Sequence, residues 1–411
     1  MGPGSARTFI LLAAAALIAA ACSPLSFSHN PPAQYPSPHV SAPSEDLSDL
    51  TPEERLAQLR RVTGEACTPN RNTNNFRSGM GLFCVPFDSI PAIDDPTFVP
   101  ASEADFLPAA EPVAVVEVGG EDRAYPIRIL NTHEVVNDVV AGRPIVVSFC
   151  PLCNSTAGFS REVDGRTLIF GVSGQLLSSN LVMFDRETIS LWQQVSGEAY
   201  AGEFDGKKLE RILVQMVSFG SWRTAHPDGV VMEEPAPDFD YGRDPYATYA
   251  DDPTAGSKFF GVPGSAERGN DRLLPKARLI GVQTSGGAVT FPMPKGGGRF
   301  AVRDANLGGR PLVAFWRKGT ALTGLSTRLD EAPRGWSGTV WVARLDGKRL
   351  HFRAGPGGFV ESRTGSLFDL FGRGISGPLK GRTLRSIPQI TAFWFSWSDS
   401  YPDTKIAGDG G

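Results

Sequence analysis

The stretch GRPIVVSF, residues 142–149, recurs later in the chain as GRPLVAFW, residues 309–316. Five further blocks recur in the same order and with similar spacing. They are AVVEVGGEDRAYPI (114–127) with IGVQTSGGAVTFPM (280–293), VDGRTLIF (163–170) with LDGKRLHF (345–352), TISLW (188–192) with TGSLF (364–368), GEFDGKKLERI (202–212) with GPLKGRTLRSI (377–387), and SWRTAHPD (221–228) with SWSDSYPD (396–403). Such self-similarity indicates a duplicated structural unit. We therefore predict two tandem, pseudo-symmetric units, residues 111–232 and 277–407, joined by an Asp/Pro/Gly-rich connector over 233–276.

The pattern within each unit is mostly that of β-strands. PVAVVEV and RAYPI flank the hairpin signal GGED, and a second hairpin turns at Asp-Gly within REVDGRTLIF. RPIVVSF predicts a buried strand. LNTHEVVNDVV, residues 130–140, predicts the main helix of the unit, and SFGSWRTAH, residues 218–226, predicts a short helix capped by Ser218. The predicted fold is therefore a β-rich α+β protein, with the second unit degenerate and structural.

The N-terminal part of the chain has the pattern of an exported protein. Residues 1–22 contain a run of thirteen apolar residues from Phe9 to Ala21, too short to span a bilayer, and end at Cys22 after three alanines. We expect a signal peptide whose cleavage leaves Cys22 lipidated, so that the membrane is a partner through that lipid. A Pro/Ser-rich tether follows over 23–50, and then a region over 51–110. That region opens with a helix from Thr51 and contains a loop that we expect a Cys67–Cys84 disulfide to close.

Composition places the rest of the chain among globular proteins. The 411 residues are 41% hydrophobic and carry a formal net charge of −4. The chain has no basic run that would serve as a nucleic-acid footprint, so nucleic acid is not an expected partner. We expect the protein to reside in the cell envelope or periplasm, where disulfides persist.

Comparison of the two units separates positions for chemistry from positions for folding. Cys150 and Cys153 of the first unit align with Arg317 and Thr320 of the second. His226 aligns with Tyr401, and His133 has no histidine counterpart in the second unit. Because the reactive residues are lost as a group, we expect them to work together in the first unit.

One interpretation of this group is a metal site. Thiolates and imidazoles are the usual ligands of zinc and copper, and His133, Cys150, Cys153 and His226 would complete a tetrahedral shell. Glu134 or a backbone carbonyl would then orient a histidine. Each histidine taken alone is as well explained by ordinary helix chemistry.

Two other interpretations remain open. The cysteine pair could be a redox dithiol, although the hairpin pattern after Cys153 argues against a thioredoxin-like site, which needs a helix there. The pair could also be a plain structural disulfide in a non-catalytic binding or scaffold protein. Glu134, Asp185 and Arg186 are the candidates for catalytic side chains beside it, whereas DFDYGRD, residues 238–244, predicts a solvated connector.

Several of these stretches together resemble a known family. AYPIRILNTHEVVND, FCPLCNSTAGFSR, FGVSGQLLSSNLVMFDRETISLW, RDPYATY and LLPKARLIGV, all between about residues 90 and 293, are similar to the bacterial secreted family known as domain of unknown function 3179. Cys150, Cys153, His133, Glu134, Asp185 and Arg186 fit the family pattern. The chain departs from it at Thr132, Asn154–Ser155 and Asn180, where the family has tryptophan, Gly-Thr and aspartate. The resemblance implies no reaction.

Overall fold

The computed structural model describes residues 87–177, 180–252 and 271–408, with Thr51 and the short strands β1 (Thr68–Pro69) and β2 (Leu82–Phe83). Strands dominate this part of the chain. Its three helices are short: α3 (Ile127–His133), α4 (Phe219–Ala225) and α5 (Trp394–Ser400). The predicted β-rich α+β class is confirmed.

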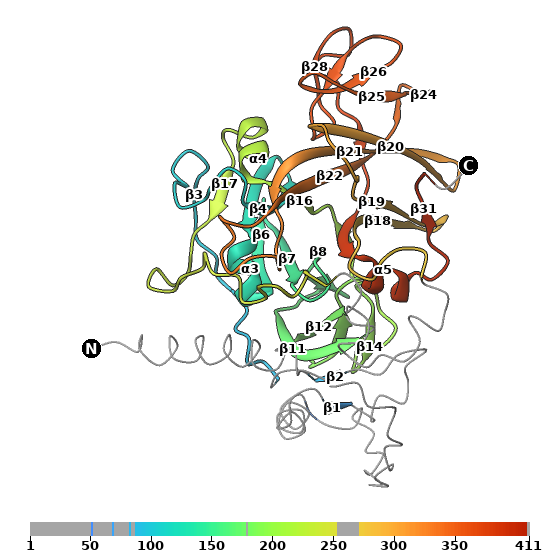
Figure 1. Ribbon diagram of the computed structural model, residues 1–411. Helices are drawn as coiled ribbons and strands as arrows, with labels where there is room; N and C mark the ends of the chain where they lie inside the picture. The colour runs from blue at the N-terminus through green and yellow to red at the C-terminus, as the bar shows by residue number, and fades with distance from the viewer. Residues whose placement is uncertain are drawn as a thin grey trace, which may run out of the picture.

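Two sheets form the centre of the first unit (Figure 1). One has the order β16-β4-β5-β17-β3, from Gln215–Ser218, Pro112–Val118, Glu121–Pro126, Val230–Met232 and Phe98–Pro100. The other has the order β15-β8-β7-β6, from Arg211–Ile212, Ser155–Ser160, Arg143–Cys150 and Val135–Val140. Neighbouring strands are antiparallel except for β17 beside β5.

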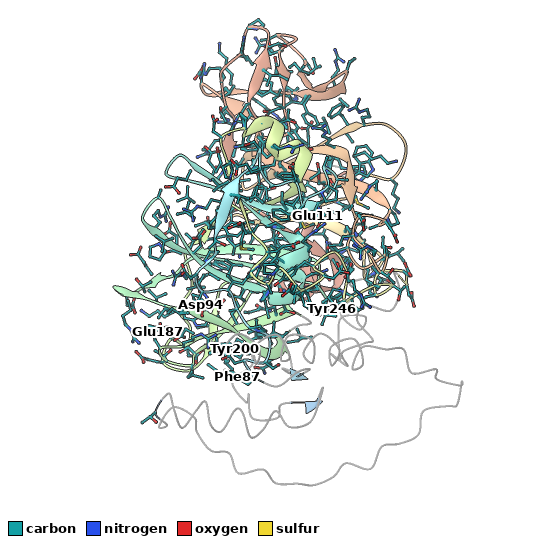
Figure 2. The ribbon with its side chains drawn as sticks, turned by 90° about the vertical axis from the view of Figure 1, so that its left-hand side faces the viewer. Phe87, Asp94, Glu111, Glu187, Tyr200 and Tyr246 are labelled. Carbon is teal, nitrogen blue, oxygen red and sulfur yellow. A yellow bond between two sulfur atoms is a disulfide. The ribbon has the colours of Figure 1, made fainter. Side chains whose placement is uncertain are left out.

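A third sheet of the first unit lies at one end of the molecule. It contains β11 (Phe170–Leu177), β12 (Asn180–Asp185), β13 (Leu191–Gln193) and β14 (Ala199–Ala201), with β2 and β1 added at the β11 edge. A separate ribbon pairs β9 (Glu162–Val163) with β10 (Arg166–Thr167). Figure 2 shows Phe87 and Tyr200 at this end and Glu111 nearer the middle of the molecule.

The second unit has three sheets and a ribbon in the same sequence order. Its sheets are β30-β18-β19-β31 (Ile390–Phe393, Arg278–Thr284, Gly287–Pro292, Lys405–Ile406), β29-β22-β21-β20 (Arg385–Ser386, Arg334–Val342, Arg310–Ala321, Phe300–Leu307) and β25-β26-β27-β28 (Phe352–Gly355, Gly358–Glu361, Leu367–Phe368, Gly374–Ser376). Its ribbon pairs β23 (Arg344–Leu345) with β24 (Lys348–Arg349).

Strand pairing is equivalent in the two units. β16 is antiparallel to β4 and β17 is parallel to β5, as β30 is antiparallel to β18 and β31 is parallel to β19. A helix follows the edge strand in each case, α4 after β16 and α5 after β30. This arrangement is compatible with the predicted duplication of residues 111–232 as 277–407. In Figure 1 the β11–β14 and β25–β28 sheets lie at opposite ends of the molecule.

The turn signals in the sequence form the hairpins that were expected from them. Gly119 and Gly120 connect β4 to β5, and both have positive φ (60° and 87°). Asp164 and Gly165 connect β9 to β10 with φ of 49° and 77°, the left-handed pair that a two-residue hairpin turn needs. Ser218 caps α4 as predicted, because its side chain accepts a hydrogen bond from the Ser221 N–H.

The helix predicted over 130–140 is wrong beyond His133. Helix α3 ends at His133, because the φ of 59° at Glu134 breaks the helical path, and the chain continues as β6. The next residues include Val135, Val136 and a Val139–Val140 pair, and β-branched side chains favour a strand. The predicted strand RPIVVSF is confirmed as β7, which pairs with β6 along its length.

The hydrophobic core crosses the boundary between the units. One cluster contains Trp192 of the first unit together with Leu279 and Trp397 of the second. Another cluster contains Trp222 and Phe315, again one from each unit. The two units therefore pack against each other through buried apolar side chains.

Tight packing around Trp397 gives a test of this shared core. A methyl group at Gly281 would overlap the Trp397 ring, whereas one at Gly297 would meet nothing within 4 Å. We expect Gly281→Ala to lower the free energy of unfolding by about 1–3 kcal/mol, because overpacking is destabilising. Gly297→Ala, measured by the same denaturant titration, should leave it unchanged or slightly raised. Equal stability of the two variants would contradict the packing.

Candidate functional site

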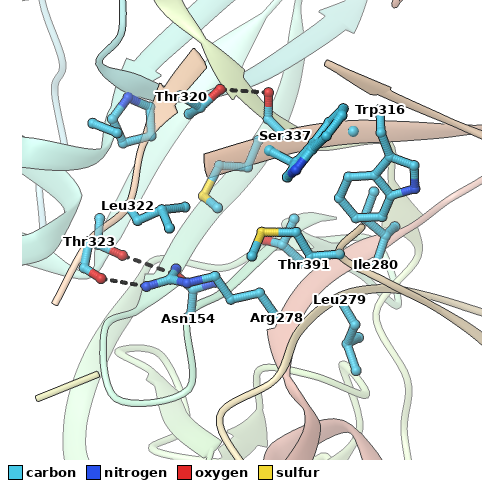
Figure 3. A pocket seen from close by; sticks show the side chains of 16 residues that line it. Asn154, Arg278, Leu279, Ile280, Trp316, Thr320, Leu322, Thr323, Ser337 and Thr391 are labelled. Atoms are coloured by element: carbon cyan, nitrogen blue, oxygen red, sulfur yellow. Dashed lines mark hydrogen bonds between the residues drawn. The ribbon is translucent and has the colours of Figure 1, made fainter. Parts of the chain in front are cut away.

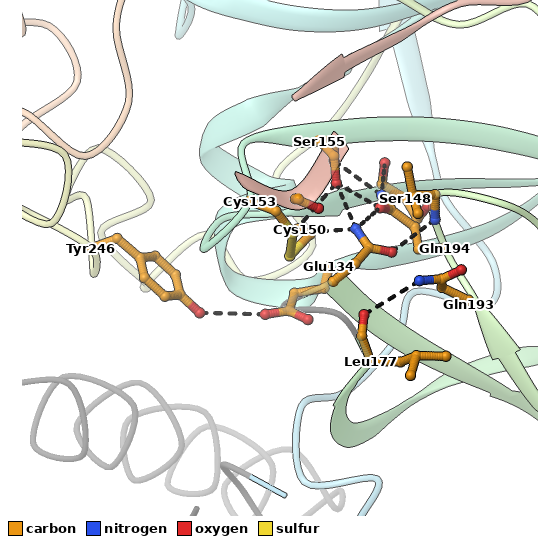
Figure 4. Close-up of a disulfide and its surroundings, with 12 residues drawn as sticks. Glu134, Ser148, Cys150, Cys153, Ser155, Leu177, Gln193, Gln194 and Tyr246 are labelled. Carbon is orange, nitrogen blue, oxygen red and sulfur yellow. Dashed lines mark hydrogen bonds between the residues drawn. A yellow bond between two sulfur atoms is a disulfide. The ribbon is translucent and has the colours of Figure 1, made fainter. Parts of the chain in front are cut away.

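A disulfide closes the turn between the two central strands of the first unit (Figure 4). β7 ends at Cys150 and β8 begins at Ser155, and these two residues pair across the hairpin. Cys150 is bonded to Cys153, with the two Cα atoms 5.4 Å apart. Cys150 is 2% exposed and Cys153 is fully buried. The pair therefore lies at the end of a buried hairpin, as the strand pattern on both sides of it predicted.

The sulfur of Cys153 has polar neighbours on one side. Nδ2 of Asn180 lies 3.3 Å from it and also donates to Oε1 of Gln194 at 2.9 Å. The Ser155 hydroxyl donates to the same Gln194 oxygen at 2.6 Å. All three side chains are buried. This network fixes an amide N–H against a sulfur atom, and such a donor stabilises a thiolate more than a disulfide sulfur.

The second unit holds the disulfide turn from the other side (Figure 3). Asn154, which has a φ of 49°, accepts hydrogen bonds at Oδ1 from Arg278 at 2.7 Å and from the Thr323 hydroxyl at 3.0 Å. The Phe393 N–H donates to the carbonyl of Cys153 at 2.7 Å. Burial lowers the pKa of Arg278 to about 10. These bonds fix the turn in a conformation that a non-glycine residue rarely adopts.

Glu134 is a buried carboxylic acid beside this turn. Its carbonyl accepts from the Phe149 N–H at 2.8 Å, which places it next to the strand end that carries Cys150. Figure 4 shows its side chain between the disulfide and Tyr246, whose hydroxyl donates to it at 3.3 Å. Burial raises the pKa of Glu134 to about 8, and the Tyr246 hydrogen bond acts in the opposite direction. The buried carboxyl of Glu134 is therefore mostly protonated at neutral pH in the folded protein.

His133 does not face the cysteines. Its Nδ1 lies 2.8 Å from the carbonyl of Pro91, so Nδ1 carries the proton, and Nε2 accepts from the Tyr241 hydroxyl at 2.9 Å. Burial lowers the pKa of His133, which favours this neutral form. Both ring nitrogens are occupied, and the residue joins α3 to the segment after residue 233.

His226 lies in a different part of the molecule. It follows α4, its ring packs against Trp222 and Phe371, and its Nδ1 is 2.9 Å from Asp122. Within the described residues, no group of three or more His, Cys, Asp or Glu side chains could hold a metal ion. The structure therefore does not bring the four predicted zinc or copper ligands together. The second unit lacks these residues at separate places in the fold, so their joint loss does not indicate a single site.

Asp185 and Arg186 form hydrogen bonds and an ion pair with nearby side chains. Asp185 accepts hydrogen bonds from the backbone and hydroxyl of Thr188 and from Nε1 of Trp192. Glu361 builds the corresponding turn in the second unit with Thr364. Arg186 pairs with Asp88 at 2.8 Å. These contacts give the predicted catalytic Asp185 a turn-forming role, common to both units.

Predictions for the N-terminal region fall mostly outside the described residues. Cys22, Cys67, Cys84 and the helix expected after Thr51 all lie there, and their lipidation and disulfide stay predictions. No helix in the described ranges is long and apolar enough to cross a membrane.

Sequence reasoning missed the side chains that complete the site. Gln194 lies in an unremarkable polar context, and no local pattern marks it. Arg278 lies in LLPKARLIGV and Tyr246 lies in RDPYATY, two stretches singled out only by the family resemblance. The expectation that 238–244 is a solvated connector holds for exposed Asp238, Asp240 and Arg243. It is wrong for Tyr241 and Asp244, which are buried against α3.

Comparison with known proteins gives a family and no activity. A family model described as "Protein of unknown function (DUF3179)" matches residues 87–404. The chain belongs to this family. The match runs through both units, so the DUF3179 domain includes the second unit and is longer than the stretch whose motifs were recognised. No curated protein and no solved structure matches the chain.

The pKa of Glu134 predicts how stability depends on pH. Below about pH 4.5 the carboxyl is protonated in both the folded and the unfolded chain. Between that pH and about 8 only the unfolded chain loses the proton, so Glu134 makes stability fall as the pH rises. Glu134→Gln should remove this contribution of Glu134 to the pH dependence of stability. Its stability relative to wild type should therefore grow by up to about 1.4 kcal/mol per pH unit through that window. Denaturant titrations of both proteins across the window measure it, and a pH-independent difference would contradict the raised pKa.

Proposed function

We propose that this protein is a thiol–disulfide redox protein in which Cys150 and Cys153 are the exchanging pair. One observation carries the proposal: the disulfide is flanked by an N–H donor to the Cys153 sulfur and by a carboxylic acid with a pKa of about 8. Thiol–disulfide exchange needs a stabilised leaving thiolate and a proton for it. Asn180 and Glu134 offer those two functions.

The short spacing of the pair also supports redox chemistry over a structural cross-link. The cysteines are three residues apart and lie in one hairpin turn. In the chain-entropy model a loop this short stabilises a fold by only about 2 kcal/mol, against about 4.7 kcal/mol for a 100-residue loop. Hydrogen bonds from β12 and from the second unit already hold this turn.

The exchange is proposed to begin at Cys150, the more exposed of the pair. A substrate thiolate attacks its Sγ, the Cys150–Cys153 bond breaks, and the electron pair leaves on Cys153 Sγ, which Asn180 stabilises. Glu134 supplies a proton to the released thiolate and regains it from the second substrate thiol. That second thiolate attacks the substrate sulfur of the mixed disulfide and releases the Cys150 thiolate, which takes up from solvent the proton that the first substrate thiol lost.

The electrons balance over this cycle. Two substrate thiols become one disulfide, and Cys150 and Cys153 become two thiols. An external protein or low-molecular-weight disulfide then reoxidises the pair by the reverse steps. The substrate class is therefore a dithiol, in a protein or peptide.

The compartment is part of the same proposal. The signal-peptide pattern of 1–22 and the lipidation expected at Cys22 would place the redox pair outside the cytoplasm, tethered to a membrane. An oxidising compartment would keep Cys150–Cys153 in its disulfide form. Zinc or copper binding by the reduced pair would require further ligands from beyond the described residues, and no contact favours it.

A dithiol oxidation assay tests the proposal. Purified protein, with glutathione disulfide as the terminal oxidant, should speed the oxidation of a two-cysteine peptide, and Cys150→Ser and Cys153→Ser should each abolish this. Asn180→Leu should slow the reaction roughly tenfold to a hundredfold. This factor corresponds to the loss of about 1.5–3 kcal/mol, the contribution of a hydrogen bond to a charged group. Arg317→Gln, at the position that aligns with Cys150, is the matched control and should keep full activity.

Two results would overturn the proposal. In the first, wild type oxidises the peptide no faster than Cys150→Ser, which would make the pair a structural disulfide. In the second, activity survives in both serine variants, which would place the chemistry elsewhere. Trapping a mixed disulfide between the peptide and Cys153→Ser would identify Cys150 as the attacked sulfur.

A further inference from the structure

A cavity of about 240 Å³ lies between the two units, away from the disulfide. Its walls come from β4, β5 and α4 of the first unit and from β22 and the β27–β29 region of the second. Exposed Glu117 and Ser386 lie at its rim, while Trp222, Phe371 and Leu384 are buried. This volume equals about eight water molecules and is below the usual range for drug-sized ligands. A ligand that fits it must be small.

Three buried polar atoms of residues that line this cavity have no hydrogen-bond partner among the described residues. They are Nε2 of His226, Nε2 of Gln215 and Oδ1 of Asp122, whose distance of 2.9 Å to Nδ1 of His226 is that of an ion pair. His226 is 5% exposed and Gln215 is 6% exposed. Buried polar atoms in folded proteins are nearly always paired, so three unpaired atoms on residues around one cavity favour a ligand that completes them.

The charges around the cavity are already paired with one another. Arg373 lies 3.4 Å from Glu117 and donates to the carbonyl of Ala225 at 3.0 Å. Nδ1 of His226 lies 2.9 Å from Asp122 and 3.3 Å from Arg373. The unpaired atoms are therefore an amide nitrogen, an imidazole nitrogen and one oxygen of the ion-paired Asp122 carboxylate. A neutral ligand that both donates and accepts suits them, because a charged one would have to break an existing pair.

The second unit lacks this set at the corresponding positions. The strand registers place Ala288 where Asp122 is and Ile390 where Gln215 is, and Tyr401 aligns with His226. Both units keep the tryptophan of the helix, Trp222 and Trp397, so the fold does not need the polar set. The polar residues are specific to the face that forms the cavity.

We propose that this cavity binds a small neutral polyhydroxylated molecule of the size of a monosaccharide. A hydroxyl group both donates and accepts, so it can complete Gln215 Nε2 as an acceptor and His226 Nε2 in either tautomer. Buried Trp222 and Phe371 provide apolar walls for the carbon face of such a molecule. This binding is independent of the exchange proposed for Cys150 and Cys153.

Calorimetric titration of the full chain tests the proposal with defined probes. D-glucose, D-galactose, D-mannose and myo-inositol are each titrated, together with glucuronate and glucosamine as charged counterparts of one ring. We expect saturable binding of at least one neutral probe with a millimolar or tighter Kd, and weaker binding of the charged compounds. Gln215→Leu and His226→Phe should each weaken it at least fivefold. Gln283→Leu, the same change on β18 of the second unit, should bind as wild type does.

Several outcomes decide the question. No saturable binding of any neutral probe overturns the proposal, as does an affinity that Gln215→Leu and His226→Phe leave unchanged. Preferred binding of glucuronate or glucosamine overturns the neutral class. If His226→Phe lowers the melting temperature sharply, Gln215→Leu alone decides. Cys150→Ser should bind the probe as wild type does, which separates this site from the redox proposal.

Discussion

The hydrogen bond from the Phe393 N–H to the carbonyl of Cys153 joins the second unit to the disulfide turn of the first. Arg278 and Thr323 add the two bonds to Asn154. Through these contacts the second unit, which lacks the cysteines, positions the turn that carries them. The family model extends over both units, and the structure gives a physical reason why one unit alone would leave the turn unsupported.

Forming the site has an unfavourable free energy, and a few residues account for most of it. Glu134 has a positive φ and a buried carboxyl with a pKa of about 8, and Asn154 also has a positive φ. Strained backbone and buried ionisable groups persist only where surrounding contacts hold them, and they cluster at functional sites. Apolar burial disfavours a thiolate, and the Asn180 N–H is the local group that offsets this for Cys153. In this protein the strained backbone and the buried carboxyl lie beside the one disulfide that the described residues contain.

Local and repeating patterns in the sequence predicted much of the fold. The β4–β5 and β9–β10 hairpins follow from their turn residues, and the strand β7 from its apolar run. The helix over 130–140 failed because helical spacing of Leu130, Glu134 and Asn137 competed with β-branched valines, and pairing with β7 favoured a strand. The hairpin after Cys153, which argued against a thioredoxin-like site, was correct.

The site itself was less accessible to sequence reasoning. Comparison of the units found Cys150, Cys153 and His226, but loss from the second unit does not measure distance in the first. His226 lies in the cavity and His133 binds Tyr241, so the two histidines serve separate purposes. Asn180, Gln194 and Tyr246 reach the site through tertiary contacts between residues far apart in the chain, which no local pattern records.

The reduction potential of the Cys150–Cys153 pair tests the central claim most directly. Equilibration of the full chain in dithiothreitol and glutathione redox buffers, with the two thiols quantified by alkylation and mass spectrometry, measures it. An exchanging pair should have a potential above about −300 mV, in the range of known oxidoreductases. A value well below that would show a structural disulfide that cellular thiols cannot reduce, and would contradict the account.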